Sequence, residues 1–212
     1  MHKGIFVTAT GTEVGKTYVS CKIAESLKKL RINVGVFKPV STGDRNDAQA
    51  LIKAAKIQET LETVTPIFFN NPMSPYGASL LEKKQLNLKK IYSTFKYFLN
   101  KYEFIIVEGI GGLMVPLKEN FFVNDLIKKM NLPTIIVTEP GLGTINHTLL
   151  TIEKLKNDKQ KILGIILSRY GNKYDISAKS NAKIIKKITG LPIFELGYNK
   201  KIKLKGNEWI IK

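Results

Sequence analysis

The sequence predicts an α/β fold with a mostly parallel β-sheet and helices on both faces. Short apolar runs rich in Ile, Val and Phe alternate with longer helix-like segments, which is the pattern of a parallel sheet. The runs show little alternation of polar and apolar residues, as strands buried on both faces should. Predicted strands are Ile5–Thr8, Val34–Phe37, Phe104–Val107, Thr134–Thr138 and Ile162–Leu167. Predicted helices are 16–30, 47–56, 88–101, 121–131, 144–158 and 175–188.

The loop after the first strand carries the strongest functional signal. Ala9–Thr17 reads ATGTEVGKT and ends in Gly15-Lys16-Thr17 where a helix is predicted to begin. It resembles the phosphate-binding loop G-x-x-x-x-G-K-[ST], with Thr10 in the place of the first glycine. Backbone N–H groups and the positive end of the helix favour an anion there. The alternative is a glycine turn before an ordinary helix. We predict a three-layer P-loop NTPase-like fold.

Two side chains of this loop have predicted roles in phosphate chemistry. Lys16 is placed to reach the β- and γ-phosphates of a nucleotide, and the Thr17 hydroxyl is placed to bind Mg²⁺. Gly15 allows the tight turn that points successive N–H groups at phosphate oxygens. The loop therefore predicts a nucleoside triphosphate as a ligand.

Length and composition fit one globular domain. The chain has 212 residues and 43% hydrophobic content, so we expect a single domain over residues 1–212. No apolar run reaches the roughly 18 residues that span a bilayer, and the N-terminal sequence lacks a signal-peptide pattern. One cysteine, Cys21, fits a reducing compartment. We expect a cytoplasmic protein with no membrane partner, and we interpret Cys21 as a buried helix residue.

The net charge of +17 invites a nucleic-acid interpretation. Of the 34 basic residues only Arg31, Arg45 and Arg169 are arginines, although Arg dominates specific base and phosphate recognition. The lysines are spread over helix surfaces, so we expect no nucleic-acid partner. The basic segment Lys200–Lys205 is open to two interpretations, a surface strand or a solvated tail, and we favour the tail. Asn70–Gly77 is predicted to be irregular.

Three charged residues lie near the ends of predicted strands. Lys38 follows the second strand, Glu108 ends the third, and Asp47 begins a predicted helix. Taken singly, such a lysine is usually a solvated surface residue and such an aspartate an N-cap. Together with the phosphate loop they complete a site, because two carboxylates and the Thr17 hydroxyl supply the oxygen ligands that Mg²⁺ prefers. Thr17, Asp47 and Glu108 are therefore the candidate metal ligands.

The order of these motifs resembles the dethiobiotin synthetase family over about residues 4 to 170. Ser74-Pro75 followed by Glu82 fits the same family. The motifs that carry the resemblance are Thr10–Thr17, Lys38-Pro39-Val40, Asn46-Asp47-Ala48, Val107-Glu108-Gly109-Ile110-Gly111-Gly112 and Ile145-Asn146-His147.

The resemblance implies a homodimer that closes 7,8-diaminononanoate with CO₂ or bicarbonate to dethiobiotin, using ATP and Mg²⁺. It implies Lys16, Lys38 and Thr12 as catalytic residues. The implied nucleotide-binding residues are Glu13, Val14, Gly15, Lys16, Thr17, Tyr18, Asp47, Glu108, Gly109, Ile110, Gly111 and Ser168. The implied substrate-binding residues are Thr12, Lys38, Thr42, Gly143, Thr144, Ile145 and Asn146, with the last four serving the neighbouring subunit. His147 is interpreted as structural.

The chain departs from the family at the base site. Ser168, followed by Arg169, stands where the family has an asparagine that reads adenine, and the chain after Leu191-Pro192 lacks a second base loop. Milder departures are Ala9 and Gly11 in the phosphate loop. The main alternative is a partitioning or positioning ATPase acting on DNA or a membrane. Such proteins carry a second lysine near Gly11 or Thr12, and this chain has none there.

Overall fold

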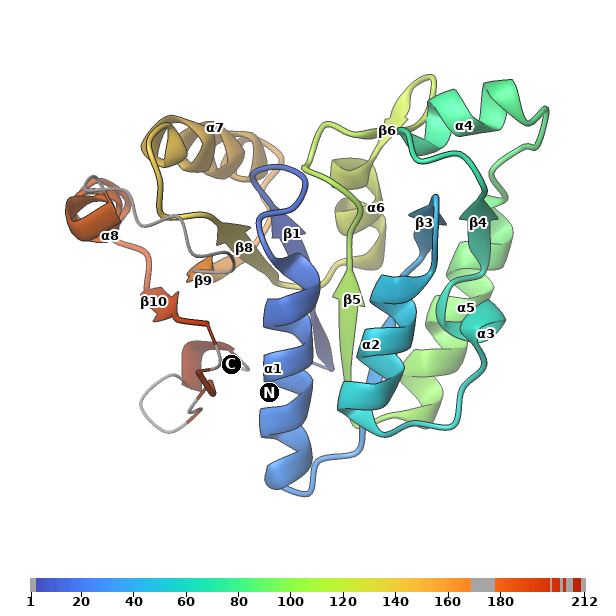
Figure 1. Ribbon diagram of the computed structural model, residues 1–212, viewed down its shortest axis with the longest axis horizontal. Helices are drawn as coiled ribbons and strands as arrows, with labels where there is room; N and C mark the ends of the chain where they lie inside the picture. The colour runs from blue at the N-terminus through green and yellow to red at the C-terminus, as the bar shows by residue number, and fades with distance from the viewer. Residues whose placement is uncertain (1–2, 169–177, 199, 203, 205–207, 211–212) are drawn as a thin grey trace.

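The computed structural model places a parallel sheet between two layers of helices (Figure 1). It describes residues 3–168, 178–198, 200–202, 204 and 208–210. Within that part the central sheet has six strands in the order β10-β9-β8-β1-β5-β2, all paired in parallel. Their bounds are β1 Gly4–Ala9, β2 Val34–Phe37, β5 Phe104–Glu108, β8 Thr134–Thr138, β9 Ile162–Ser168 and β10 Ile193–Leu196. The five predicted strands are confirmed, and β10 is an addition.

Each predicted helix is present, with its ends shifted by no more than a few residues. Helices α1 (Lys16–Lys29) and α2 (Asn46–Ala55) cover one face of the sheet (Figure 1). The other face is covered by α5 (Leu88–Lys101), α6 (Val123–Met130), α7 (Thr144–Asn157) and α8 (Ala178–Thr189). The first three residues of the predicted helix 175–188 lie outside the described residues. The fold class predicted from the sequence is confirmed.

Several short elements lie outside the central sheet. Strand β3 (Val40–Thr42) pairs in parallel with β4 (Ile67–Phe69), and β6 (Pro116–Lys118) pairs antiparallel with β7 (Phe121–Phe122). The predicted helix start at residue 121 is wrong by two residues, because Phe121–Phe122 pair with β6. The remaining elements are α3 (Leu61–Val64), α4 (Pro75–Leu81) and a 3₁₀ turn at Glu208–Ile210.

The prediction of an irregular segment over Asn70–Gly77 is wrong in its last three residues. Pro75–Gly77 form the first turn of α4, and the Ser74 hydroxyl accepts a hydrogen bond from the Gly77 N–H. A capping serine followed by proline at the first helical position is a common helix start. The sequence therefore contained a helix signal inside a stretch that its prolines marked as a loop.

The central strand β1 divides the core into two halves. Ile5 and Val7 pack with apolar residues of α1 and α2, whereas Phe6 between them packs with residues of α5, α6 and α7. Side chains of successive strand residues point to opposite faces, so an uninterrupted apolar run fills both halves. This packing fixes the position of the loop that leaves the C-terminal end of β1.

The C-terminal segment is not a solvated tail, which corrects the favoured interpretation. Ile202 and Leu204 are only 3% and 7% exposed and belong to the core half beneath α1. Ser26 of α1 donates a hydrogen bond from its Oγ to the Ile202 carbonyl at 2.7 Å. The lysines that precede them, Lys200 and Lys201, are exposed, so the described part of this segment is amphipathic.

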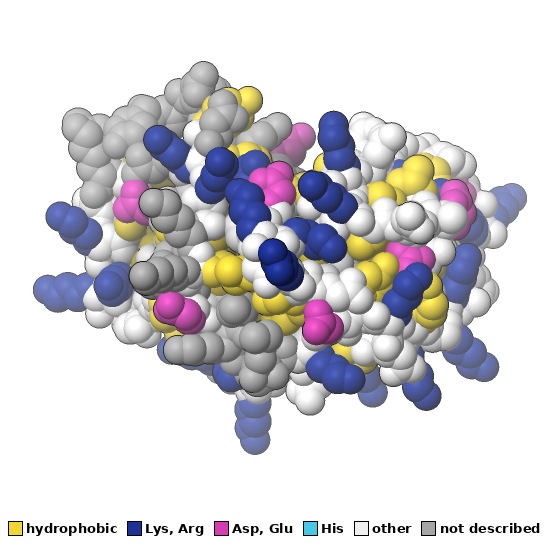
Figure 2. Space-filling view, turned by 90° about the horizontal axis from the view of Figure 1, so that it is seen from below, with side chains coloured by type: hydrophobic (Ala, Val, Ile, Leu, Met, Phe, Trp, Pro, Cys, Tyr) yellow, Lys and Arg dark blue, Asp and Glu magenta, His cyan; other side chains and the backbone are white. Residues whose placement is uncertain are grey.

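Basic side chains are spread widely over the surface. Figure 2 shows Lys and Arg scattered over the whole lower face, with acidic and apolar side chains between them. Among the described residues, no helix is long and apolar enough to cross a membrane. This distribution agrees with the expectation that the charge does not mark one nucleic-acid groove, which stays a prediction.

Candidate active site

The phosphate loop runs from the end of β1 to the start of α1. Gly15 adopts a left-handed backbone with φ of 93°, and no side chain caps the helix that follows it. Glu13 also has a positive φ, 58°, which is uncommon for a residue with a side chain. The uncapped start of α1 leaves its positive end to serve a bound anion. The local backbone thus has the features that phosphate binding needs.

Thr10, which replaces the first glycine of the motif, ties the loop to the next strand. Its N–H donates to the Val137 carbonyl at 3.1 Å, and its hydroxyl lies 3.0 Å from the Thr138 hydroxyl. The Thr138 hydroxyl in turn lies 2.7 Å from that of Thr144 at the start of α7. A glycine could not make these side-chain contacts. Threonine is therefore accommodated by hydrogen bonds to β8 and, through β8, to α7.

Lys16 is largely buried at the start of α1. Only 8% of the residue is exposed, and its Nζ donates to the Gly11 carbonyl across the loop at 3.0 Å. Burial and, to a smaller extent, the nearby Lys38 ammonium together lower the pKa of the Lys16 ammonium to about 8. The Glu108 and Asp47 carboxylates offset this lowering only in part, so an arriving polyphosphate would further stabilise the protonated form of Lys16.

Lys38 joins the two candidate metal-binding carboxylates. Its Nζ lies 2.8 Å from Asp47 Oδ2 and 2.7 Å from Glu108 Oε1, and it donates to the Gly109 carbonyl at 3.2 Å. The Thr17 hydroxyl lies 2.7 Å from Asp47 Oδ1 and 2.9 Å from Glu108 Oε1. One hydroxyl donates one hydrogen bond at a time, so Thr17 can serve either carboxylate.

Charge pairing dominates the protonation of this cluster. Burial by itself would lower the pKa of the Lys38 ammonium, but the Glu108 and Asp47 carboxylates outweigh it and raise that pKa above its ordinary value. Burial by itself would raise the pKa of the Asp47 carboxyl, but Lys38 and the Thr17 hydroxyl lower it below its ordinary value. The cluster therefore favours the ammonium form of Lys38 and the carboxylate form of Asp47.

The two carboxylates and Thr17 present only oxygen atoms to a cation. The Oε2 atom of Glu108 is buried and accepts no hydrogen bond from any described residue, so it has acceptor capacity to spare. No group of three or more His, Cys, Asp and Glu side chains among the described residues could hold a metal. The donor set suits a hard ion such as Mg²⁺, which keeps several waters and uses one or two carboxylates together with substrate phosphates.

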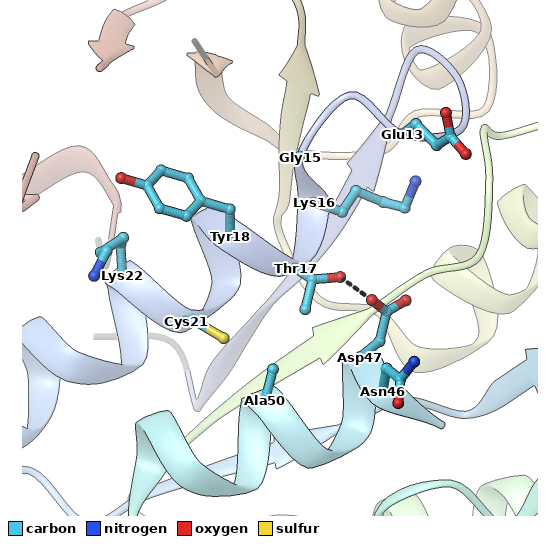
Figure 3. Close-up of a pocket in the computed structure, with 10 residues that line it drawn as sticks. All are labelled: Glu13, Gly15, Lys16, Thr17, Tyr18, Cys21, Lys22, Asn46, Asp47 and Ala50. Carbon is cyan, nitrogen blue, oxygen red and sulfur yellow. Dashed lines mark hydrogen bonds between the residues drawn. The ribbon is translucent and has the colours of Figure 1, made fainter. Parts of the chain in front are cut away.

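Two cavities meet at Lys16. The first, of about 750 Å³, lies between α1 and α2 (Figure 3). It is lined by Glu13, Gly15, Lys16, Thr17, Tyr18, Cys21, Lys22, Asn46, Asp47 and Ala50. The second, of about 510 Å³, is lined by Thr12, Glu13, Lys16, Lys38, Ser41, Thr42, Asp44, Asp47, Pro72, Met73, Ser74, Pro75, Ile110, Gly111 and Val115. Glu13, Lys16 and Asp47 belong to both.

Most of the predicted site residues come together around these cavities. Thr12, Lys38 and Thr42, which the resemblance placed at the diamine, line the second cavity with Ile110 and Gly111. Others have supporting positions. Val14 is buried beneath the loop, and Gly109 packs its backbone against Phe6, where an added Cβ would lie 3.0 Å from the ring.

Besides Val14, Glu108 and Gly109, five further predicted residues line neither cavity. Ser168, at the end of β9, is 1% exposed and its hydroxyl has no hydrogen-bond partner among the described residues. Gly143, with φ of 89°, is the N-cap of α7, and Asn146 in its first turn is exposed. Arg169 lies outside the described residues. The remaining two of the five are Thr144 and Ile145.

The structure adds residues to which the sequence gave no role. Pro72 and Met73 form one wall of the second cavity, and the Glu82 carboxylate holds their loop by accepting from both the N–H and the side-chain amide of Asn71. Tyr198, two residues after β10, stacks with Tyr18 at a ring-centroid distance of 6.4 Å. The prolines predicted a loop, but no sequence signal predicted that Pro72 and Met73 line the cavity or that Tyr198 stacks with Tyr18.

Cys21 lines the first cavity and is only partly buried. Burial raises the pKa of its thiol to about 12, with Glu108 and Glu25 adding to the effect. A thiol with that pKa carries almost no thiolate at neutral pH, and the thiolate is the nucleophile. The interpretation of Cys21 as a helix residue is confirmed, but it is less buried than expected because it lines the cavity.

Comparison with known proteins identifies the family. An ATP-dependent dethiobiotin synthetase from Endomicrobium trichonymphae is 72% identical over 216 residues, which span 100% of both chains. The chain belongs to the dethiobiotin synthetase family. Another ATP-dependent dethiobiotin synthetase, from Thermodesulfovibrio yellowstonii, is 41% identical and covers 91% of this chain and 87% of the relative. A family model described as an AAA domain matches residues 3–201.

Solved structures support the fold of this dethiobiotin synthetase family member. The MinD cell division protein of Aquifex aeolicus matches with a TM-score of 0.57 at 17% identity, covering 99% of this chain and 86% of the other. The structure of pNOB8 ParA bound to nonspecific DNA matches with a TM-score of 0.54 at 12% identity, covering 99% and 91%. At these identities the likeness concerns the α/β architecture. It does not extend to the activity of a positioning ATPase.

Proposed function

We propose that this chain uses ATP to close 7,8-diaminononanoate and CO₂ into dethiobiotin, a step of biotin synthesis. The observation that carries the proposal is the meeting of two cavities at Lys16, with Lys38 on the wall of the second. A triphosphate on the loop would have its γ-phosphate next to the second cavity. A diamine in that cavity would then lie within reach of the transferring group.

The chemistry begins with a carbamate. One amine of the substrate attacks CO₂ as the free base and releases a proton, forming a C–N bond and a carbamate anion. Lys16 and Lys38 line the second cavity, and positive neighbours lower the pKa of an amine and favour its free base. The same two cations then stabilise the carbamate anion that forms.

Phosphoryl transfer and ring closure follow. A carbamate oxygen attacks the γ-phosphorus of ATP and ADP leaves, giving a carbamic–phosphoric anhydride. The second amine attacks the carbonyl carbon and phosphate leaves, which closes the ureido ring. Little covalent work is required of the protein in such a sequence, so positioning and charge stabilisation supply the catalysis. Thr12 and Thr42, on the wall of the same cavity, are the hydroxyls that would orient the amines.

Mg²⁺ is the metal that this donor set fits, with Thr17, Asp47 and Glu108 as its ligands. When bound, it would neutralise charge on the phosphates. The proximity of these three side chains supports the assignment, because Thr17 Oγ1 lies 2.7 Å from Asp47 Oδ1 and 2.9 Å from Glu108 Oε1. The unpartnered Oε2 of Glu108 gives the site an additional acceptor.

A homodimer with shared active sites is part of the proposal. Gly143–Asn146 line neither cavity of their own chain, yet the family resemblance assigns them to the distal carboxylate of the substrate. The start of α7 suits an anion. Large apolar side chains near it are exposed, with Leu142 at 83% and Leu150 at 57%. Contact with a second copy would cover these side chains and bring the start of α7 to the neighbouring cavity.

Complementation tests the proposal in cells. We expect the gene for this chain to restore growth without biotin to a bacterium lacking its own dethiobiotin synthetase. The Lys16→Ala variant is the matched control, since it removes the phosphate-binding cation, and we expect it not to restore growth. Growth with the Lys16→Ala variant, or failure of the unchanged chain when the folded protein is detected in the cells, would contradict the proposal.

A further inference from the structure

A tyrosine pair lies beside the nucleotide cavity and has no part in the chemistry proposed above. Tyr18 follows the phosphate loop on α1, and Tyr198 lies two residues beyond β10 at the other end of the chain. Their rings are nearly parallel, with planes 13° apart and centroids 6.4 Å apart. The Tyr18 hydroxyl donates to the Gly197 carbonyl at 3.1 Å, which fixes the two segments relative to each other.

The layout of the cavities decides where the base of a nucleotide must lie. In the proposed function the γ-phosphate would face the second cavity, whose lining includes Thr12, Lys38 and Thr42. The nucleoside must therefore extend from Lys16 in the other direction, along the first cavity. Figure 3 shows the Lys16 and Tyr18 side chains pointing in opposite directions from the start of α1. Tyr18 and Lys22 line that side of the first cavity.

We propose that the base of the bound nucleotide packs flat against the aromatic surface formed by Tyr18 and Tyr198. This inference rests on the proposed use of ATP. Tyr198 is 54% exposed, so a base can reach it without the core opening. Lys22 lies 5.6 Å above the Tyr18 ring and adds a positive charge near the ribose and base.

The aromatic surface of Tyr18 and Tyr198 would supply a contact with the nucleotide base, which Ser168 at the end of β9 does not provide. Ser168 is buried and its short side chain lines neither cavity. Stacking needs no particular pattern of donors and acceptors, because every base has a π-face. A base can therefore be held by aromatic contact even where no amide side chain reads its edge.

Binding measurements on single variants test this inference. The probes are ADP, GDP, CDP and inorganic tripolyphosphate, each titrated calorimetrically into the protein with Mg²⁺. For Tyr198→Ala we expect the three nucleoside diphosphates to bind about tenfold more weakly, a change of about 1.4 kcal/mol. Tripolyphosphate has no base, so its affinity should not change. Tyr198→Phe keeps the ring and should bind all four probes like the unchanged protein.

Tyr97→Ala is the matched control, because Tyr97 is a comparably exposed tyrosine, 42% exposed, on α5 at the other face of the sheet. Equal nucleotide affinity for Tyr198→Ala and Tyr97→Ala would overturn the inference. So would an equal loss of tripolyphosphate binding, since the effect would then lie in the phosphate site. The proposed activity is measured separately, as dethiobiotin formed. Tyr198-dependent nucleotide binding without that product would leave the inference standing and remove the proposed function alone.

Discussion

Lys38 and Glu108 form a buried ion pair at the C-terminal edge of the sheet, with Nζ and Oε1 2.7 Å apart and side chains 3% and 0% exposed. Lys38 follows β2 and Glu108 ends β5, two strands that pair in parallel. Parallel neighbours bring their C-terminal ends together, so the pair follows from the topology. The same ammonium also contacts Asp47, and the ion pair thus holds the candidate metal ligands in place.

We predict that Lys38→Met loses ring formation while it keeps nucleotide affinity. Lys38 lines the second cavity, which we assign to the diamine, and is absent from the lining of the first cavity, which we assign to the nucleotide. Calorimetric titration with ADP and an assay of dethiobiotin measure the two effects. Loss of nucleotide binding with an intact diamine site would contradict the assigned role.

The same substitution should also destabilise the fold. It leaves the buried Glu108 carboxylate without its partner, and breaking a buried ion pair in this way costs about 3–5 kcal/mol. Adding Glu108→Gln removes the stranded charge, so the double variant should regain much of the lost stability in urea unfolding. A double variant less stable than Lys38→Met alone would show that the pair is not the source of the loss.

Lys16→Ala should abolish phosphoryl transfer and leave the fold intact. Its lowered pKa means that the folded protein disfavours the Lys16 ammonium, so removing it relieves an unfavourable charge. At Lys38 the effect is the opposite, because its raised pKa means that the folded protein favours the ammonium. Losing a cation from such a site costs about 3–4 kcal/mol in the barrier, or about 10²–10³-fold in kcat. The unfolding midpoint checks the fold, and release of phosphate from ATP checks the chemistry. Near-normal turnover of the Lys16→Ala variant would contradict the assignment of this loop as the phosphate-binding site.

Nucleotide affinity should fall as the pH rises above about 8, the pKa of Lys16 in the folded protein. Above that pH the free protein must take up a proton to present an ammonium to the phosphates, which costs up to about tenfold in affinity per pH unit. Lys16→Arg stays charged and should lack this dependence. ADP titrations from pH 7 to 10 measure it, and a flat profile in the unchanged protein would contradict the role of Lys16.

The stability of the nucleotide-free protein should respond to pH in the opposite sense. The pKa of Lys16 is about 8 in the folded protein, whereas the ordinary value for lysine, 10.5, applies to the unfolded chain. Between pH 8 and pH 10.5 the unfolded chain therefore binds more protons than the folded protein. Stability due to this group therefore rises with pH over that window. The difference in unfolding free energy between the unchanged protein and Lys16→Arg isolates this effect.

The strands and helices that pack into the core could be predicted from the sequence, and the short ones could not. Runs such as Phe104–Val107 are apolar on both faces and read as buried strands. Val40–Thr42 and Ile67–Phe69 are only three residues each, too short for a periodicity. Ile193–Leu196 includes Glu195, which interrupts the apolar run.

The parts of the site that depend on backbone topology could be predicted from the sequence. The parts that depend on the direction of individual side chains could not. Lys38 and Glu108 could be assigned to one site because the ends of parallel strands converge, and Asp47 joins them from the first turn of α2. Their direct ion pairs could not be foreseen, because they depend on how each side chain turns. The stacking of Tyr198 on Tyr18 could not be foreseen, since the two residues lie near opposite ends of the sequence.

A composite dimer predicts that two inactive variants can restore activity together. Lys16→Ala damages the phosphate loop, and Asn146→Ala damages the start of α7 that we propose to serve the neighbouring subunit. In a mixed dimer one of the two sites carries neither change, so mixing the variants should recover part of the activity. Two Lys16→Ala preparations mixed together are the control. A fully active monomer in sedimentation would reject the shared site.

Discrimination among nucleotide bases should be weak. Ser168 offers one short hydroxyl in the place where the family has an amide that both donates and accepts. A site built to hydrogen-bond a group can reject analogues by ~10⁴ or more, but we expect kcat/KM for ATP, GTP and CTP to agree within about tenfold, or roughly 1.4 kcal/mol. Steady-state kinetics with each nucleotide measure this ratio. A thousandfold preference for ATP would show that another segment reads adenine.

The formation of dethiobiotin from labelled bicarbonate tests the central claim most directly. The purified chain is mixed with 7,8-diaminononanoate, ¹³C-bicarbonate, Mg²⁺ and ATP, and the products are analysed by mass spectrometry. Dethiobiotin carrying one ¹³C atom, formed together with ADP and phosphate and absent without ATP or with Lys16→Ala, is the result that our account predicts. ATP hydrolysis by the folded protein with no labelled dethiobiotin would contradict it.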